Sequence, residues 1–271
     1  MKNFFKPLII VFSLLAFVAC NEDDNRFSVD SESGWVQFVN NSTVDLAYGI
    51  VDEVRIPVNL NSVVNANGLD VTFSIVDVVG SSAPYLINNG VFTIEKGTLK
   101  GELVFGLSTT VPLTSSIEFD VVLSTTSRSN VSIGLIDNSR PVVKRFRICP
   151  INFAATYRGV PTNSLGTVGP AFTATFTPVV GQTNAFNVNT LWGQNYIASL
   201  TGSAAQNGRF INPGILSLVP TSTNVNVVGL TPNFSTGGTG SIDACSGVIK
   251  VTVNQLLFGN PFTVTTVFTP I

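Results

Sequence analysis

Histidine is absent from the 271 residues of this chain. The absence removes the usual general base of enzymes and the commonest protein ligand of transition metals. A Ser-His-Asp triad is therefore excluded. The sequence also contains no Gly-x-Ser-x-Gly nucleophile turn and no Walker-type phosphate loop. The common routes to acyl transfer and phosphate chemistry are missing, and we expect neither a metal ion nor another cofactor.

Charged residues are scarce as well, at 11% of the chain, and the 14 basic residues do not outnumber the 16 acidic ones. Because nucleic-acid-binding proteins carry a basic surplus, nucleic acid is not an expected partner. Beyond Pro150 the only carboxylate side chain is that of Asp243. A glycosidase needs two neighbouring carboxyl groups, so this half cannot supply the pair alone. Glu118 and Asp120 share one face of an expected strand, which leaves an unrecognised hydrolase as an alternative. The ordinary explanation is that both side chains lie on the solvent-facing side of a strand that alternates polar and apolar residues.

One apolar run of twelve residues, at positions 7–18, follows Lys2 and Lys6 near the start of the chain. It is shorter than the roughly 20 residues that span a bilayer, but it suits the apolar region of a secretory signal. The run ends in Phe17-Val18-Ala19-Cys20, which resembles the lipobox of bacterial lipoproteins. In that family the thiol of the Cys receives a diacylglycerol and the signal is cut before it. The resemblance implies a signal peptide at residues 1–19 and a membrane anchor on Cys20.

An acidic cluster, Asn21-Glu22-Asp23-Asp24, comes directly after Cys20. It resembles the export signal that sends lipoproteins of Bacteroidetes-type bacteria to the outer face of the outer membrane. The resemblance implies a lipid-anchored protein of the outer membrane that faces the cell exterior. A charge run is also simply a solvated segment, which leaves a periplasmic orientation open. We expect residues 20–33 to form a flexible tether.

The rest of the chain has an all-β composition. Val, Thr and Phe favour strands, whereas the abundant Asn, Gly and Ser favour turns. No convincing amphipathic helix is present. The 252 residues from Cys20 onward are enough for two ordinary domains.

Residues 34–148 alternate apolar and polar side chains over about eight short segments, the density typical of a β-sandwich. Val36-Gln37-Phe38, followed by the segments at 55–60, 90–97 and 118–123, resembles Calx-β and related immunoglobulin-like modules of bacterial surface proteins. The resemblance implies an immunoglobulin-like β-sandwich. Calx-β modules often bind Ca²⁺ through dense acidic loops, but Asp70, Asp77 and Asp137 are scattered here. Calcium binding is therefore not expected. The expected strands are 34–38, 52–60, 70–78, 90–97, 100–107, 117–123, 132–136 and 141–148.

Residues 149–271 form a second expected β-domain, because the composition shifts sharply at Pro150. The strand pattern fits either a second β-sandwich or a small β-barrel. We interpret residues 237–240 as a flexible hairpin loop and Ser246-Gly247 as a tight turn. The expected strands are 172–176, 185–188, 196–200, 214–219, 224–229, 240–245, 248–256 and 263–268.

The layout of Ile148-Cys149-Pro150, Thr156-Tyr157-Arg158-Gly159 and the segment 240–247 resembles the C-terminal halves of uncharacterised surface lipoproteins of Bacteroidetes-type bacteria. Genes for such proteins often lie beside those of outer-membrane nutrient uptake systems. The resemblance implies a location and a pathway, but no chemistry.

Three cysteines are present, and lipidation of Cys20 leaves Cys149 and Cys245 as an even pair. In an exported, oxidising setting such a pair predicts a disulfide, with two buried free thiols as the alternative. Two cysteines without histidine make a poor metal site.

The segment Leu191-Trp192-Gly193-Gln194-Asn195-Tyr196 places two aromatic rings beside two amides. Aromatic faces stack on sugar rings and amides bind hydroxyl groups, so Trp192, Asn195 and Tyr196 are candidate carbohydrate-binding residues. Burial of both rings in a strand is the simpler interpretation. We conclude that the chain is a non-enzymatic surface lipoprotein, a binding or accessory module for a glycan or an uptake-complex partner. A structural or adhesive spacer is the main alternative.

Overall fold

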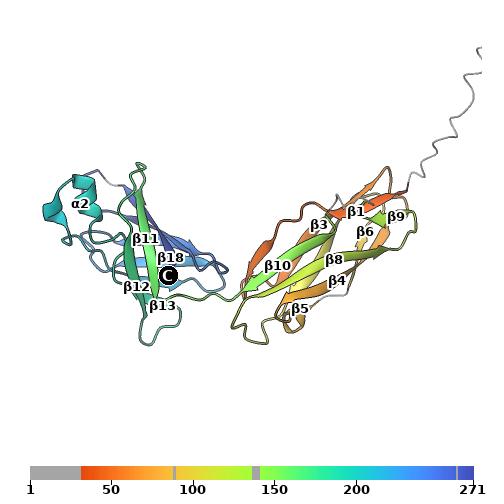
Figure 1. The fold of residues 1–271 in the computed structure, drawn as a ribbon, viewed down its shortest axis with the longest axis horizontal. Helices are drawn as coiled ribbons and strands as arrows, with labels where there is room; N and C mark the ends of the chain where they lie inside the picture. The colour runs from red at the N-terminus through yellow and green to blue at the C-terminus, as the bar shows by residue number, and fades with distance from the viewer. Residues whose placement is uncertain (1–31, 88–89, 136–140, 261) are drawn as a thin grey trace, which may run out of the picture.

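The computed structural model describes residues 32–87, 90–135, 141–260 and 262–271, and the expected signal peptide and Cys20 lie outside this part. Its regular structure is almost entirely β, as the composition predicted. The strands form two bodies joined end to end (Figure 1). Within the described ranges, no helix is both long and apolar enough to span a bilayer.

The first body is an immunoglobulin-like β-sandwich of two five-stranded sheets. Its pairing is antiparallel except where β1 meets β9 and β10 meets β2. One sheet consists, in spatial order, of β5 (Leu86–Ile87), β7 (Lys100–Leu107), β3 (Glu53–Ser62), β1 (Gly34–Phe38) and β9 (Val131–Ile133). The other consists of β2 (Val44–Ala47), β10 (Val143–Cys149), β8 (Ile117–Thr126), β4 (Leu69–Val79) and β6 (Val91–Ile94), and the short helix η1 (Ala83–Tyr85) precedes β5.

Side-chain alternation places the apolar residues of both sheets in one core. Three rings form its centre, because Phe105 lies edge-on to both Phe119 and Phe146, with centroids 5.9 and 5.4 Å away. All three rings are buried. The outward face of β8 and β10 is polar instead, and Arg145 binds Asp120 there through two hydrogen bonds of 2.8 and 3.0 Å. The period of two in the sequence therefore does predict which face of each strand is buried.

The end of the expected tether is fixed to the sandwich. A carboxylate oxygen of Glu32 accepts a hydrogen bond from the peptide N–H of Ala66 at 2.9 Å, and Glu32 also lies 3.3 Å from Arg128. Glu32, near the end of the expected tether, thus has partners on the sandwich, and β1 begins at Gly34.

The second body is a closed barrel of eight strands in chain order, with β11 pairing to β18. Every neighbouring pair is antiparallel, so the chain runs up and down around the wall, and of the two expected architectures the barrel is the one observed. The strands are β11 (Thr156–Asn163), β12 (Phe172–Pro178), β13 (Ala185–Val188), β14 (Gly214–Leu218), β15 (Asn224–Gly229), β16 (Gly237–Ile242), β17 (Ile249–Asn254) and β18 (Thr263–Pro270).

The inside of the barrel is filled by side chains. An eight-stranded barrel has an interior just wide enough for side chains to occupy. Here Tyr157, Phe176 and Phe268 pack together, with ring centroids 4.4 to 6.3 Å apart, and all three are buried. A ligand therefore has to bind at the surface of the barrel rather than along its axis.

Three expectations for this body are corrected. Residues 196–200, expected as a strand, lie in the helix α2 (Tyr196–Thr201), and a short helix η2 (Ala204–Gln206) follows. Residues 237–240, expected as a loop, belong to β16. Its glycines have no side chains, which allows the strand to lie close to its neighbours: a Cβ on Gly238 would collide with the carbonyl oxygen of Thr252. β11 was not expected, because Gly159 and Pro161 interrupt its pattern.

A disulfide joins the two bodies, as predicted. Cys149 ends β10 of the sandwich, and Cys245 lies in the turn between β16 and β17 of the barrel, with the two Cα atoms 5.1 Å apart. Asp243 shapes this turn, because its carboxylate accepts hydrogen bonds from the peptide N–H groups of Cys245 at 3.0 Å and Ser246 at 2.8 Å. The cross-link closes a loop that contains most of the barrel.

We expect removal of this disulfide to destabilise the barrel more than the sandwich. The two cysteines are 96 positions apart, and closing so long a loop restricts the unfolded chain by roughly 2 to 5 kcal/mol. The double variant Cys149→Ser with Cys245→Ser should lose that amount in the unfolding transition of the barrel, measured by calorimetry. A reducing agent should lower the wild-type midpoint and leave that of the double variant unchanged. Equal midpoints for the two oxidised proteins would contradict the assignment.

Candidate functional site

Four loops form the end of the barrel away from the sandwich, and buried polar side chains hold them. Asn163 accepts hydrogen bonds from two peptide N–H groups of the first loop, at 3.1 and 2.8 Å. Gln255 does the same in the last loop, at 2.9 and 3.0 Å, and Asn212 accepts the hydroxyl of Thr231 at 2.8 Å. The backbone of this end is thereby fixed. The described residues of these loops are 164–171, 189–213, 230–236, 255–260 and 262.

The longest of these loops closes the end of the barrel with Trp192 and Tyr196. Both residues are 0% exposed. The indole N–H of Trp192 donates to the carbonyl oxygen of Phe210 at 2.9 Å, and the two rings lie 6.3 Å apart. The expectation that these rings offer flat faces to a sugar is therefore wrong. Both rings are buried and cover the apolar core at the open end of the barrel. Of the three candidate residues, only Asn195 is exposed.

The hydroxyl group of Tyr196 has no hydrogen-bond partner within the described part of the chain, and burial raises its pKa to about 12. A buried hydroxyl without a partner costs about 1 to 3 kcal/mol of desolvation. We therefore expect Tyr196→Phe to leave the free energy of unfolding unchanged or to increase it by about 1 kcal/mol, in chemical denaturation of the barrel.

Tyr157→Phe is the matched control for this change. The Tyr157 hydroxyl accepts a hydrogen bond from the peptide N–H of Ala154 at 2.9 Å, so its loss should destabilise the barrel by about 1 kcal/mol. A larger loss of stability in Tyr196→Phe than in Tyr157→Phe would show that the Tyr196 hydroxyl has a stabilising partner after all.

The same loop opens a gap in the barrel wall. β12 pairs with β13 over only three residues, 176–178, and past Val188 the chain leaves the wall to form the loop 189–213. The side chain of Asn189 spans the start of the gap, where its carboxamide oxygen accepts the peptide N–H of Thr175 at 2.9 Å. Beyond this bond, residues 171–173, at the start of β12 and just before it, have no neighbouring strand on the side that faces the gap.

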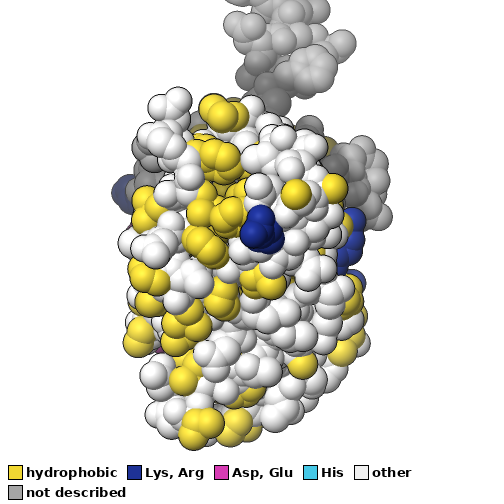
Figure 2. Space-filling model, turned by 90° about the vertical axis from the view of Figure 1, so that its left-hand side faces the viewer, with side chains coloured by type: hydrophobic (Ala, Val, Ile, Leu, Met, Phe, Trp, Pro, Cys, Tyr) yellow, Lys and Arg dark blue, Asp and Glu magenta, His cyan; other side chains and the backbone are white. Residues whose placement is uncertain are grey.

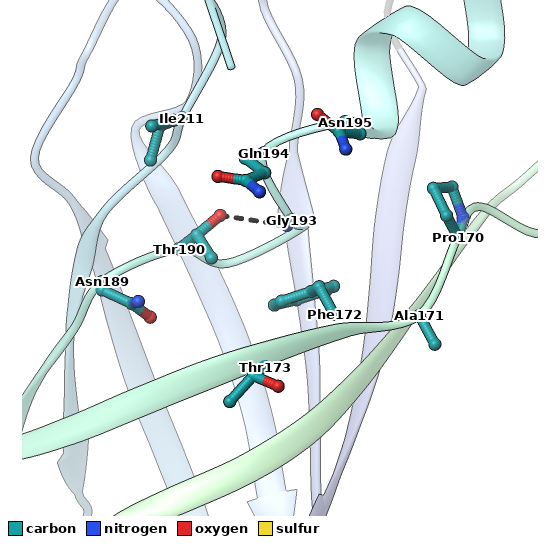
Figure 3. A pocket seen from close by; sticks show the side chains of 10 residues that line it. All are labelled: Pro170, Ala171, Phe172, Thr173, Asn189, Thr190, Gly193, Gln194, Asn195 and Ile211. Carbon is teal, nitrogen blue, oxygen red and sulfur yellow. Dashed lines mark hydrogen bonds between the residues drawn. The ribbon is translucent and has the colours of Figure 1, made fainter. Parts of the chain in front are cut away.

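A pocket of about 460 Å³ occupies this gap. Figure 3 shows the half-buried ring of Phe172 in the middle, the amides of Gln194 and Asn195 on one side of it, and Thr173 on the other. The volume is within the range of small-molecule sites. The pocket is lined by Pro170, Ala171, Phe172, Thr173, Asn189, Thr190, Gly193, Gln194, Asn195 and Ile211.

Gly193 sets the shape of the pocket. Its φ of +85° favours glycine, and a Cβ at this position would lie 2.6 Å from Cδ1 of Phe172. Its peptide N–H is held by the buried hydroxyl of Thr190 at 2.9 Å. This turn projects Gln194 and Asn195 into solvent above the Phe172 ring (Figure 3).

No charged side chain lines this pocket. Its polar groups are three carboxamides and two threonine hydroxyls, and its apolar surface comes from Phe172, Pro170 and Ile211. Such a set can donate and accept hydrogen bonds but cannot transfer a proton near neutral pH. The arrangement therefore suits binding of an uncharged polar ligand rather than catalysis.

Three carboxylates of the described ranges, those of Asp45, Asp120 and Asp243, are held by turn N–H groups or by arginine. Asp45 and Asp243 line a smaller pocket of about 230 Å³ where the sandwich meets the barrel. Asp45 is bound by Arg147 through hydrogen bonds of 3.0 and 2.7 Å, and the turn N–H of Ser246 lowers the pKa of Asp243. A glycosidase acid needs a raised pKa instead. The hydrogen bonds from Arg145 likewise lower the pKa of Asp120. Within the described ranges, no three His, Cys, Asp or Glu side chains gather into a metal site.

The surface at the far end of the barrel also carries little charge. In its four loops the only charged residue is Arg209. Figure 2 views this end and shows mainly polar and apolar side chains with an isolated basic group. Several apolar side chains are exposed there, above all Leu165 at 78% and Val168 at 61%. This end therefore offers almost no charged side chain for a salt bridge.

Comparisons with known proteins leave the function open. No family model matches the chain, and no curated protein matches it in sequence. Among solved structures, the apo form of the Calx CBD1 domain is 12% identical, covering 45% of this chain and all of that one, with a TM-score of 0.36. The calcium binding domain CBD12 of CALX1.1 is 11% identical over 57% of this chain and 77% of that one, with the same TM-score.

A third similar structure is the Salmonella enterica SafA pilin in complex with the SafB chaperone. It is 12% identical, covers 84% of this chain and 94% of that one, and has a TM-score of 0.24. Likenesses this weak do not bear on function. The sandwich and barrel assignments depend on the strand pairing described above, and the candidate site depends on the pocket geometry.

Proposed function

We propose that this protein is a non-catalytic, lipid-anchored surface protein whose barrel binds a neutral glycan at the pocket between β12 and the loop 189–213. The uncharged lining of the pocket is the observation on which the proposal depends. Sugars present hydroxyl groups around apolar ring faces. The amides of Asn189, Gln194 and Asn195 can bind the hydroxyls, and the Phe172 ring can contact the apolar face.

The proposed anchor is the lipidated Cys20, and the acidic residues that follow it support an outer-membrane location facing the cell exterior. β1, the first described strand, lies at the end of the sandwich away from the barrel, and α2 marks the opposite end of the molecule (Figure 1). The sandwich would then be the spacer that holds the pocket away from the membrane. This arrangement fits an accessory protein that presents glycans to an outer-membrane uptake system.

Glycan binding is tested with the mature chain from residue 21, screened against a panel of neutral polysaccharides and then titrated by calorimetry. Gln194→Ala and Asn195→Ala each remove an exposed amide, and the loss of about 0.5 to 1.5 kcal/mol should weaken binding by roughly two- to twelvefold. Asn226→Ala, on the outward face of β15, is the matched control and should bind as wild type. No retention on any glycan would count against the proposal.

We expect this affinity to be nearly the same at about pH 5 and about pH 8, and at low and high salt. No titratable side chain lines the pocket, so neither protonation nor screening should change its hydrogen bonds. A strong dependence on salt, measured in the same titrations, would point to a ligand site that includes Arg209 or a carboxylate instead.

The anchor is tested separately by detergent phase partition of the full chain expressed in a lipoprotein-processing bacterium. The two acyl chains of a diacylglycerol hold a protein far more firmly than one, so the wild type should enter the detergent phase. Cys20→Ser should remain in the aqueous phase or retain its signal peptide. Aqueous partition of the wild type would contradict lipidation without affecting the glycan proposal.

A protein partner is the second candidate ligand for the barrel. The exposed Leu165, Val168, Leu230 and Leu256, together with the near absence of charge, favour an interface at the same end. If glycans fail to bind, cross-linking from this end in cells that carry the uptake system becomes the next experiment.

A further inference from the structure

One edge of β12 is unpaired inside the pocket, and the strand register shows which peptide groups lie there. The N–H of Phe176 donates to the carbonyl oxygen of Ala155, so the even-numbered residues of β12 turn their peptide groups toward β11. The N–H of Thr175 points the other way, to the side chain of Asn189. Because peptide groups alternate along a strand, the N–H and the C=O of Thr173 both point into the gap.

These two groups of Thr173 have no hydrogen-bond partner among the described residues. The loop opposite uses its own groups locally: the peptide N–H of Gly193 binds the hydroxyl of Thr190, and the N–H of Leu191 binds the carbonyl oxygen of Asn212 at 2.7 Å. An unpaired strand edge is a template for a ligand that offers a matching acceptor and donor. The pocket therefore presents a fixed backbone donor and acceptor in addition to its side-chain amides.

The geometry of Thr173 restricts which ligand can bind both groups. The N–H and the C=O leave the strand on the same side, and covalent geometry places their nitrogen and oxygen about 3 Å apart. A ligand must therefore present an acceptor and a donor side by side at a similar separation, both facing the strand. A single trans amide does not do so, because its N–H and C=O point in opposite directions.

Two hydroxyl groups on adjacent carbons of a sugar ring meet this requirement. Their oxygens lie about 3 Å apart when the two C–O bonds are gauche, and each hydroxyl can rotate to donate or to accept. One hydroxyl can accept from the Thr173 N–H while the other donates to the Thr173 carbonyl oxygen. A single hydroxyl placed between the two groups would bend both hydrogen bonds away from linearity. The free edge therefore matches a vicinal diol.

The rest of the pocket has room for the ring that carries the diol. The free edge covers residues 171–173, about 10 Å at the rise of a strand, and the pocket of about 460 Å³ extends from it. The amides of Gln194 and Asn195 lie across the Phe172 ring from this edge (Figure 3). A sugar bound to the edge through two hydroxyls can thus contact the Phe172 ring and offer its remaining hydroxyls to the two amides.

The linkage between sugars decides whether such a diol is free inside a glycan chain. In a 1,4-linked hexopyranose chain the 2- and 3-hydroxyls of every interior ring are free, and a 1,6-linkage leaves the 2-, 3- and 4-hydroxyls. A 1,3-linkage consumes the 3-hydroxyl, and the free 2- and 4-hydroxyls are then on carbons that are not adjacent. Interior rings of a 1,3-linked chain therefore lack the vicinal diol.

We propose that the pocket binds interior units of neutral 1,4- or 1,6-linked hexose chains through a vicinal diol, which the peptide N–H and C=O of Thr173 hold. The inference rests on the proposed glycan-binding function and names its substrate class. The backbone of β12 selects the linkage of the glycan, and the pocket discriminates against 1,3-linked chains.

Long linear polymers of matched sugar and different linkage test this inference, because their interior rings far outnumber their ends. The chain from residue 21 is compared on amorphous β-1,4-glucan and β-1,3-glucan, on β-1,4-galactan and β-1,3-galactan, and on α-1,6-mannan and α-1,3-mannan. In at least one pair the 1,4- or 1,6-linked polymer should bind at least about tenfold more tightly, since the other member cannot form both hydrogen bonds. Asn226→Ala, the matched control, should show the same preference.

Amide-detected NMR places the contact on the strand edge. On titration with the pentasaccharide of the preferred polymer, cellopentaose in the case of β-1,4-glucan, the Thr173 N–H should be among the most strongly shifted signals. Thr173→Pro removes the proposed donor while keeping an extended backbone, because proline is tolerated in a strand where its N–H is unpaired. The variant should lose most of the linkage preference, with circular dichroism unchanged. If it does not fold, the Thr173 signal of the wild type decides the question alone.

The remaining outcomes separate this inference from the proposed function. Equal binding of both members of every pair that binds, or binding without a shift of the Thr173 signal, would overturn the diol assignment and leave neutral-glycan binding standing. Binding of none of the six polymers would also overturn the diol assignment, and binding of no glycan in the wider panel would overturn both proposals. Binding of an acetylated tri-alanine amide in place of every glycan, with the Thr173 signal shifted, would show a strand-addition site for a peptide and overturn both as well.

Discussion

The need to cover the barrel core with Trp192 and Tyr196 is the constraint on which the candidate site depends. A closed eight-stranded barrel buries a core of rings, and that core has to be covered at an open end. The chain leaves β13 early to cover it with the loop 189–213, which costs β12 its neighbour over residues 171–173. The pocket is the gap that this departure leaves in the wall. The departure of this loop from the wall therefore both covers the end of the barrel and leaves the gap in its side.

The chemistry of the pocket follows from the composition of the barrel. Few charges are present beyond Pro150, so recognition at this end has to use carboxamides, hydroxyls, peptide groups and apolar surface. These groups carry no net charge, so they discriminate between ligands by the positions of hydrogen-bond donors and acceptors. Asp120 and Asp243 are each bound by a partner that lowers the pKa of the carboxyl group, which is the opposite of what a catalytic acid needs. This distribution suits recognition by hydrogen bonds and apolar contacts.

Sequence alternation predicted most of the fold, and its failures have physical causes. The sandwich strands show a clean period of two, and β1 and β7 lie at the expected residues. The run 196–200 is apolar and short, so its period cannot separate a strand from a helix. Glycines at 237–240 suggested a turn, yet in a tightly curved barrel they allow close approach between strands. The choice between sandwich and barrel depended on the pairing of β11 with β18, residues about a hundred positions apart, which no local pattern encodes.

The site shows the same division between local and long-range information. Aromatic residues beside amides at 191–196 pointed to the loop that borders the pocket, and Asn195 does line the pocket. The inference failed for the rings, because whether a ring faces solvent depends on what lies beneath the loop, and beneath this loop lies an uncovered barrel core. Phe172 and Thr173 could not have been found from the sequence, since nothing there distinguishes them from other strand residues. They become site residues only because the strand beside them turns away, so their importance is a property of the register and of the closure of the barrel rather than of their own side chains.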